Sequence, residues 1–84
     1  SIGNGRCDLW VEYGGDQFVI ELKLYRDSAT RHQGLEQTAR YLSRLGLSQG
    51  YLIIFETRTG KTWEERISRE VVEVAGKTVI VMGM

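Results

Sequence analysis

The sequence is poor in cysteine, histidine and proline, which number one, one and none among its 84 residues. Cys7 alone cannot form an internal disulfide, so we expect a reducing, cytoplasmic setting. Because His32 has no evident third partner, Cys7 is better interpreted as a small buried strand residue than as a nucleophile. The sequence also has no apolar run of signal-peptide or transmembrane length.

An excess charge of either sign is missing as well, because 11 basic residues balance 11 acidic ones. Long-range attraction to nucleic acid cannot come from net charge and would need a local basic patch. The hydrophobic content of 42% and the charged content of 26% are typical of a globular domain and exclude disorder. Composition alone names no function.

The length predicts a single domain, residues 1–84, with a small core that something else could complete. The chain begins with Ser1 rather than Met and ends in the apolar run 79–82, which is typical of a core strand. We therefore expect the C-terminal fragment of a longer protein.

The first half of the chain predicts a hairpin and a crossover. Residues 6–13 and 18–25 are rich in β-branched and aromatic residues, and the turn-forming residues 14–16 separate them. Apolar residues then recur at helical spacing over 31–45, after a capping box at Thr30 and Gln33 and before a stop at Gly46.

The second half predicts a central strand and a closing hairpin. The apolar run within 51–56 is typical of a strand covered on both faces and lying parallel to 18–25. Residues 66–74 and 78–82, joined by a turn at 75–77, complete the domain. The predicted fold class is α/β, with a mixed sheet and the 31–45 helix on one face.

Two acids and a lysine on the first hairpin are the candidate reactive cluster. Glu21 and Lys23 share one face of their strand because strand side chains alternate. A two-residue loop at 14–15 would place Asp8 opposite Glu21, whereas a loop at 15–16, or a four-residue loop, would place it opposite Lys23. An odd-length loop would send Asp8 to the other face unless a bulge restored the register.

Such a cluster is costly to desolvate and suits a hard cation. Asp8, Glu21 and the backbone carbonyl of Leu22 are oxygen donors of the kind that Mg²⁺ prefers, and Mn²⁺ could substitute. Lys23 could orient an attacking water and stabilise the anion that forms at phosphorus. The chemistry predicted is hydrolysis of nucleic acid phosphodiester bonds.

Residues 5–9 (GRCDL) followed by 20–24 (IELKL) resemble the PD-(D/E)XK nuclease superfamily, whose motif is an Asp, a variable hairpin and Glu-X-Lys. Several of its branches carry a Gln on the next helix and a Tyr one turn later, as Gln37 and Tyr41 stand here. Branches behind ATPase-like domains end in a Trp-containing loop and a hairpin, which Trp63 and the residues after it match. The resemblance implies a restriction-endonuclease-like fold in which Gln37 orients the metal cluster.

The same resemblance has departures. The family core begins with a helix, which the residues before the first strand do not provide, and Cys7 replaces the family's Pro before the first Asp. A sheet face left without its helix needs cover, so we expect self-association, for example as a dimer with exchanged elements. Arg6 and Tyr41 are candidate substrate contacts, although Tyr41 also suits the core. Arg31 is one of several further charges that could contact phosphates near the site, although isolated charges on a helix usually form solvated surface.

Two alternatives stay open, because a Glu-X-Lys triplet alone is expected by chance in a chain of this size. The domain could be a nuclease-fold module that has lost catalysis and serves binding or oligomerisation within its parent protein. It could also be a partner-binding α/β module of other ancestry. In that last case Asp8 and Glu21 would lie on opposite faces or in bulk solvent.

Overall fold

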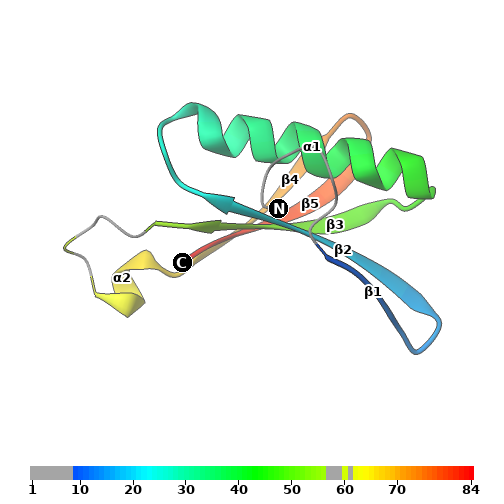
Figure 1. Ribbon diagram of the computed structural model, residues 1–84, viewed down its shortest axis with the longest axis horizontal. Helices are drawn as coiled ribbons and strands as arrows, with labels where there is room; N and C mark the ends of the chain where they lie inside the picture. Colours follow the sequence, from blue (N-terminus) through cyan, green and yellow to red (C-terminus); the bar gives the residue numbers. More distant parts are fainter. Residues whose placement is uncertain (1–8, 57–59, 61) are drawn as a thin grey trace.

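A computed structural model describes residues 9–56, 60 and 62–84, and its elements form an α/β fold (Figure 1). They follow the order β1 (Leu9–Tyr13), β2 (Asp16–Leu24), α1 (Ala29–Leu45), β3 (Gln49–Phe55), α2 (Trp63–Arg66), β4 (Ser68–Val74) and β5 (Lys77–Gly83). The strands make a five-stranded sheet in the order β1-β2-β3-β5-β4.

The mixed pairing of this sheet confirms the predicted fold class. β1 and β2 are antiparallel, β2 and β3 are parallel, and β4 and β5 form the antiparallel closing hairpin. β5 attaches the closing hairpin to β3 by a parallel pairing, which puts β3 at the centre of the sheet, as its apolar sequence predicted. The attachment point of this hairpin was not predicted.

Both hairpins turn through two residues with positive φ. Gly14 and Gly15 have φ of 60° and 87°, and Tyr13 pairs with Asp16, so the first of the predicted loop alternatives is the one adopted. Positive φ at both central positions is the requirement of a type I′ turn, whose twist matches that of the strands. The second hairpin turns at residues 75–76, one residue shorter than predicted, and its β5 strand therefore starts at residue 77.

The start of α1 differs from the prediction. The helix begins at Ala29 after Ser28, whose side chain makes no capping hydrogen bond, while the Asp27 carboxylate accepts the Ala29 N–H. The predicted capping box at Thr30 is wrong, because the Thr30 hydroxyl instead accepts the backbone N–H groups of residues 26–27. The predicted stop is confirmed, since Gly46 takes a left-handed conformation and its N–H bonds back to the last turn.

The segment before β4 also differs from the prediction of one strand over 66–74. Residues 63–66 form the short helix α2, and the strand begins at Ser68. A reciprocal pair of hydrogen bonds between Thr62 and Glu65 holds the first turn, in the manner of a capping box.

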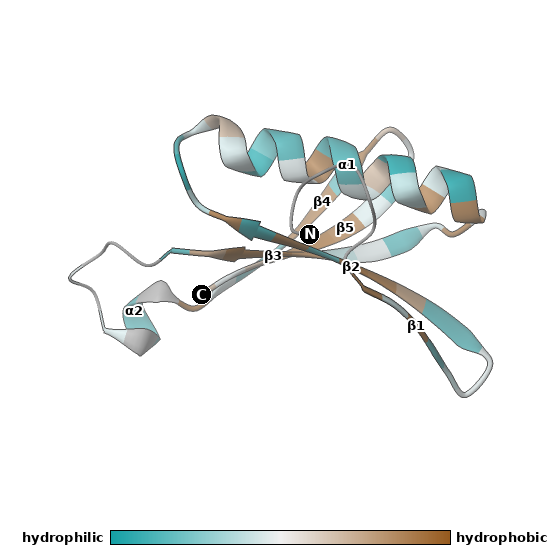
Figure 2. Ribbon diagram, viewed as in Figure 1, coloured by the Kyte–Doolittle hydropathy of each residue, from teal (hydrophilic) through white to brown (hydrophobic). Residues whose placement is uncertain are grey.

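The core lies between α1 and one face of the sheet, where the apolar positions of the helix meet the strands (Figure 2). Leu35 and Leu42 of α1 pack with Val19, Leu52 and Val79 in one buried cluster. A helix and a sheet that bury one face each against the other account for the two layers. No helix of the described residues is long and apolar enough to cross a membrane.

The opposite face of the sheet has no helix over it in the described part of the chain (Figure 1). Tyr51 and Ile53 of β3 lie on that face and are only half-buried, so the prediction that β3 is covered on both faces is wrong. Phe55 of the same strand shares this face, and so do apolar residues of the other strands: Leu9, Val11, Phe18, Ile20, Leu22, Leu24, Val71, Ile80 and Met82.

Candidate functional site

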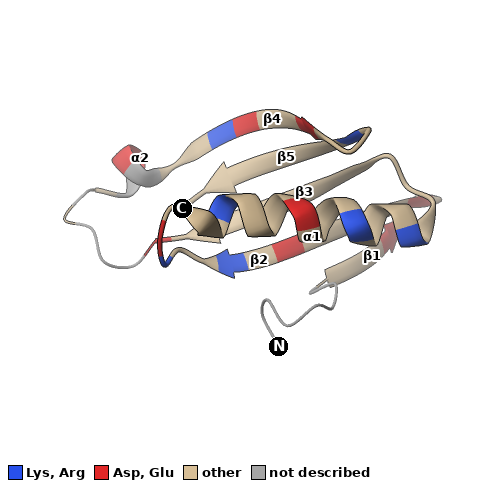
Figure 3. Ribbon diagram, turned by 90° about the horizontal axis from the view of Figure 1, so that it is seen from above, with Lys and Arg blue, Asp and Glu red and all other residues tan. Residues whose placement is uncertain are grey.

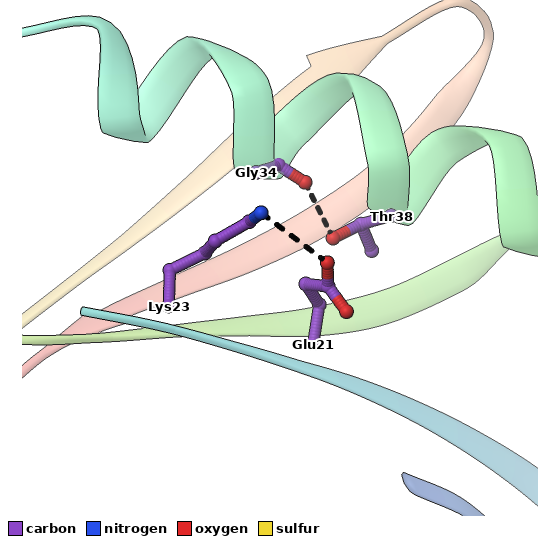
Figure 4. Close-up of polar contacts among 4 residues, drawn as sticks. All are labelled: Glu21, Lys23, Gly34 and Thr38. Carbon is purple, nitrogen blue, oxygen red and sulfur yellow. Dashed lines mark hydrogen bonds and ion pairs between the residues drawn. The ribbon is translucent and has the colours of Figure 1, made fainter. Parts of the chain in front are cut away.

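β2 carries Glu21 and Lys23 on the face that α1 covers. In the register with β3, Glu21 stands opposite Leu52 of the core, and Lys23 lies one alternation further along the same face. Figure 4 shows both side chains directed from β2 toward α1, with Lys23 Nζ 3.9 Å from Glu21 Oε2. The Glu21 side chain has 0% of its surface exposed and that of Lys23 has 12%, so the pair is an internal one.

The backbone of α1 comes unusually close to the sheet beside this pair. A Cβ built on Gly34 would lie 2.7 Å from Leu52 Cδ1, a distance that leaves no room for a side chain at position 34. One turn later the Thr38 hydroxyl donates a 2.8 Å hydrogen bond to the Gly34 carbonyl, so a buried polar group is satisfied within the helix (Figure 4). This packing shields Glu21 from water, which strengthens its attraction to Lys23.

A buried carboxylate beside an ammonium is an expensive way to stabilise a sheet. Removing both groups from water costs several kcal/mol per ion, and an apolar pair of similar volume is often as stable or more so, by about 1–4 kcal/mol. A buried ion pair is therefore weak evidence of a stabilising role.

Asp8 and Arg6 lie outside the described residues, and so does Cys7. The last pair of the described β1–β2 register is Leu9 with Ile20. Among the residues that the structure describes, no group of three or more His, Cys, Asp or Glu side chains could hold a metal ion. Glu21 is thus the described carboxylate of the predicted metal cluster.

The other predicted site residues are placed as follows. Tyr41 is 5% exposed within the core, which confirms that it suits the core, while its contact with substrate stays a prediction. Gln37 is half-buried, and its Oε1 is shielded from solvent and has no hydrogen-bond partner among the described residues. Leu22 points its side chain to the uncovered face, as the alternation of β2 requires.

The structure bears on one branch of one alternative, because Asp8 lies outside the described residues and its face cannot be compared with that of Glu21. A partner-binding module without nuclease ancestry predicts that Asp8 and Glu21 lie on opposite faces or that they face bulk solvent. Glu21 does not face bulk solvent, because α1 and the sheet enclose it.

A cavity of about 490 Å³ lies at the carboxyl ends of β3 and β5, on the side of the sheet where α1 begins. It was missed in the sequence, because its charged residues are scattered over distant segments. Ile54 lines the cavity and is the register partner of Lys23 on the neighbouring strand, whereas Glu21 and Lys23 are not among its described lining residues. Its charged lining residues are Arg31, Glu56, Glu65, Arg69 and Glu70.

An ion pair spans the cavity from the helix to the sheet. Arg31 Nη2 on the first turn of α1 lies 2.7 Å from Glu70 Oε1 on β4, and Figure 3 shows charged positions at this end of α1 and on β4. The side chains are 44% and 60% exposed, so solvent reaches both. The sequence left Arg31 open as a phosphate contact or as solvated surface, and its contact with Glu70 was not predicted, because no sequence pattern connects position 31 with position 70.

No family model, curated protein or solved structure matches this chain. Its function therefore has to be argued from the pair, the cavity and the chemistry of their residues.

Proposed function

We propose that this domain hydrolyses phosphodiester bonds of nucleic acid, with DNA as the expected substrate and Mg²⁺ or Mn²⁺ as the metal. The observation that carries the proposal is the fully buried Glu21 with Lys23 3.9 Å away on the same strand face. This arrangement is what the Glu-X-Lys part of the PD-(D/E)XK resemblance would require. A cytoplasmic setting belongs to the same proposal.

The metal site needs a second carboxylate, and the proposal assigns it to Asp8. The hairpin turns at residues 14–15 and pairs Leu9 with Ile20, so continuing this register by one residue pair would set Asp8 opposite Glu21. Asp8, Glu21 and the Leu22 carbonyl would then hold the ion. The bound ion would lower the pKa of a water, which makes that water easier to deprotonate for attack on phosphorus, and would neutralise charge on the scissile phosphate.

The residues of the chain have separate roles in this proposal. The Lys23 ammonium donates hydrogen bonds to the attacking water and then to the phosphoryl oxygens, whose negative charge grows as the water oxygen bonds to phosphorus and the ester oxygen leaves. Gln37 has a buried Oε1 without a described partner, and this oxygen accepts a hydrogen bond from the attacking water or from a water on the metal and so orients it. Arg6 and Tyr41 contact the substrate. Because Glu21 is enclosed and Lys23 keeps some exposure, ion and phosphate approach past Lys23.

A cleavage assay on mixed single-stranded and duplex DNA with Mg²⁺ or Mn²⁺ tests this proposal. Glu21→Gln and Lys23→Met should each lower the rate by about 100-fold or more, the loss typical of removing a charge-stabilising group. Glu12→Gln, an exposed acid on the adjacent strand, serves as the control and should keep the wild-type rate. Equal rates for all four proteins, or no metal-dependent cleavage by the wild type, would contradict a nuclease.

A second candidate function is favoured by the uncovered sheet face. Leu24 and Val71 on that face are 49% and 55% exposed, and a hollow of about 340 Å³ between Val11 and Met82 has an apolar lining throughout. Contiguous apolar surface of this kind marks an interaction site. The module would then associate with copies of itself or with its parent chain, without catalysis.

Sedimentation of wild type and Val71→Lys tests the self-association that this candidate predicts. The wild type should sediment as an oligomer, and the substitution should shift it toward the monomer. Trp10→Lys is the matched control, because Trp10 is an exposed apolar residue whose register partner Val19 lies on the helix-covered face. A wild-type monomer over the whole concentration range would contradict self-association.

A further inference from the structure

We propose that Arg31 is a phosphate-binding residue for the nucleic acid strand, and that Glu70 holds Arg31 in the free protein and competes with that phosphate. The inference rests on the proposed function, since it assigns the cavity beside Lys23 to the substrate. It adds a ligand contact and an internal competitor that the Glu-X-Lys motif does not contain.

The position of the cavity supports a role for it in substrate binding. Ile54 forms part of its wall and is the register partner of Lys23, so a nucleic acid strand whose scissile phosphate reaches Lys23 would pass within one β-strand of this space. The carboxyl ends of parallel strands are where open α/β sheets bind their ligands. β2, β3 and β5 are parallel to one another, and their carboxyl ends meet at this edge.

Arg31 has the right chemistry and a movable partner. A guanidinium is planar and permanently charged, and it binds phosphate oxygens in a bidentate manner. Its 2.7 Å contact with Glu70 joins two half-exposed side chains, and such surface pairs contribute little to stability. A phosphate can therefore replace the Glu70 carboxylate at Arg31 at little cost to the fold.

Of the acids that line the cavity, Glu70 is the one that would compete with a phosphate for Arg31. Glu65 is already engaged, because its carboxylate accepts the Thr62 N–H and caps α2. Glu70 is the acid that contacts Arg31, so it lowers the affinity of that guanidinium for a second anion. Glu70→Gln should then release Arg31 for phosphate, whereas Arg31→Ala removes the contact altogether.

Opposite effects of these two substitutions distinguish a binding role from a structural one. Both break the same ion pair, so a purely structural pair predicts equal small losses of stability and no change in DNA affinity. The binding role predicts weaker DNA binding for Arg31→Ala and tighter binding for Glu70→Gln. Arg31→Lys keeps the charge but loses the bidentate geometry, and it should fall between the wild type and Arg31→Ala.

The experiment is fluorescence anisotropy of a short labelled single-stranded DNA, and of its duplex, in EDTA so that no metal-dependent step contributes. Arg31→Ala should weaken binding about tenfold, in line with the loss of one charged hydrogen-bonding contact. It should also lower the slope of log affinity against log salt by about 0.7 for the single strand. Glu70→Gln should tighten binding severalfold. Arg40→Ala, an exposed arginine further along α1, is the matched control and should change neither quantity.

Three outcomes of this experiment would overturn the proposal. Affinity changes of the same sign in Arg31→Ala and Glu70→Gln would show a shared structural effect, and unchanged affinity in both would show that the cavity does not hold DNA. Absence of DNA binding by the wild type would overturn it as well. Because metal is excluded, opposite shifts without any metal-dependent cleavage would support the Arg31 site and contradict only the nuclease.

Discussion

Substitution of Lys23 by Met should destabilise the domain far more than substitution of its partner Glu21 by Gln. Lys23→Met keeps the length of the side chain but leaves the fully buried Glu21 without its neighbouring ammonium. At 3.9 Å the attraction between unit charges is about 4 kcal/mol for an effective dielectric of about 20. Breaking a buried pair from one side typically costs about 3–5 kcal/mol, and the 12% exposure of Lys23 puts the expected loss near the lower end, at about 3 kcal/mol.

Glu21→Gln removes the buried charge itself, so its cost should stay within about 1 kcal/mol. The double variant should resemble Glu21→Gln, because the buried carboxylate is absent from both. Urea unfolding followed by far-UV circular dichroism in EDTA measures all three free energies of unfolding. For a domain of this size a loss of about 3 kcal/mol lowers Tm by roughly 10–20 °C, which a thermal melt checks independently.

Arg40→Met is the control for this comparison, because it removes an exposed cation from α1 and should change stability by less than about 0.5 kcal/mol. Equal losses for Lys23→Met and Glu21→Gln would refute the reasoning. They would mean that the carboxylate is stabilised by something other than the lysine, and that the pair is not a coupled unit.

Two further predictions concern Gly34, which lies beside the pair, and Ala75 in the turn between β4 and β5. Gly34→Ala should cost about 1–3 kcal/mol of stability, because its Cβ would lie 2.7 Å from Leu52 Cδ1. Thermal melts measure this loss, and the control Ser43→Ala, at an exposed position of the same helix, should melt as the wild type does. Ala75→Asn should raise stability by about 0.5–1 kcal/mol, because Ala75 has φ of 50° and Asn-Gly is the preferred pair for a type I′ turn; an unchanged or lower urea midpoint would contradict this.

The elements of the fold could be predicted because local sequence determines them. The glycines at 14–15 and 46 require positive φ, and the apolar run of β3 required a central place in the sheet. The start of α1 could not be predicted, because the Thr30 hydroxyl could either cap the helix or accept N–H groups of the segment before it. In the structure it accepts the N–H groups of residues 26–27. The helical turn at 63–66 was not predicted, although Thr62 and Glu65 stand at the spacing of a capping box and make that contact in the structure.

The candidate site was predictable in part for similar reasons. Strand alternation put Glu21 and Lys23 on one face, and the structure confirms that they face the same way. The complete burial of Glu21 under α1 was not predictable, because it follows from Gly34 allowing the helix backbone to approach Leu52. Arg31 and Glu70 meet only through the parallel pairing of β5 with β3, a long-range contact without a local sequence pattern.

The central claim is that Glu21 belongs to a metal site, and calorimetric titration of Mn²⁺ and Mg²⁺ into wild type, Glu21→Gln and Asp8→Asn tests it most directly. The account predicts a single binding event in the wild type that either substitution abolishes or weakens by at least about tenfold. The exposed Glu12→Gln should bind metal as the wild type does. Equal binding by all four proteins, or no binding by the wild type, would contradict the account and leave the uncovered sheet face as the functional surface.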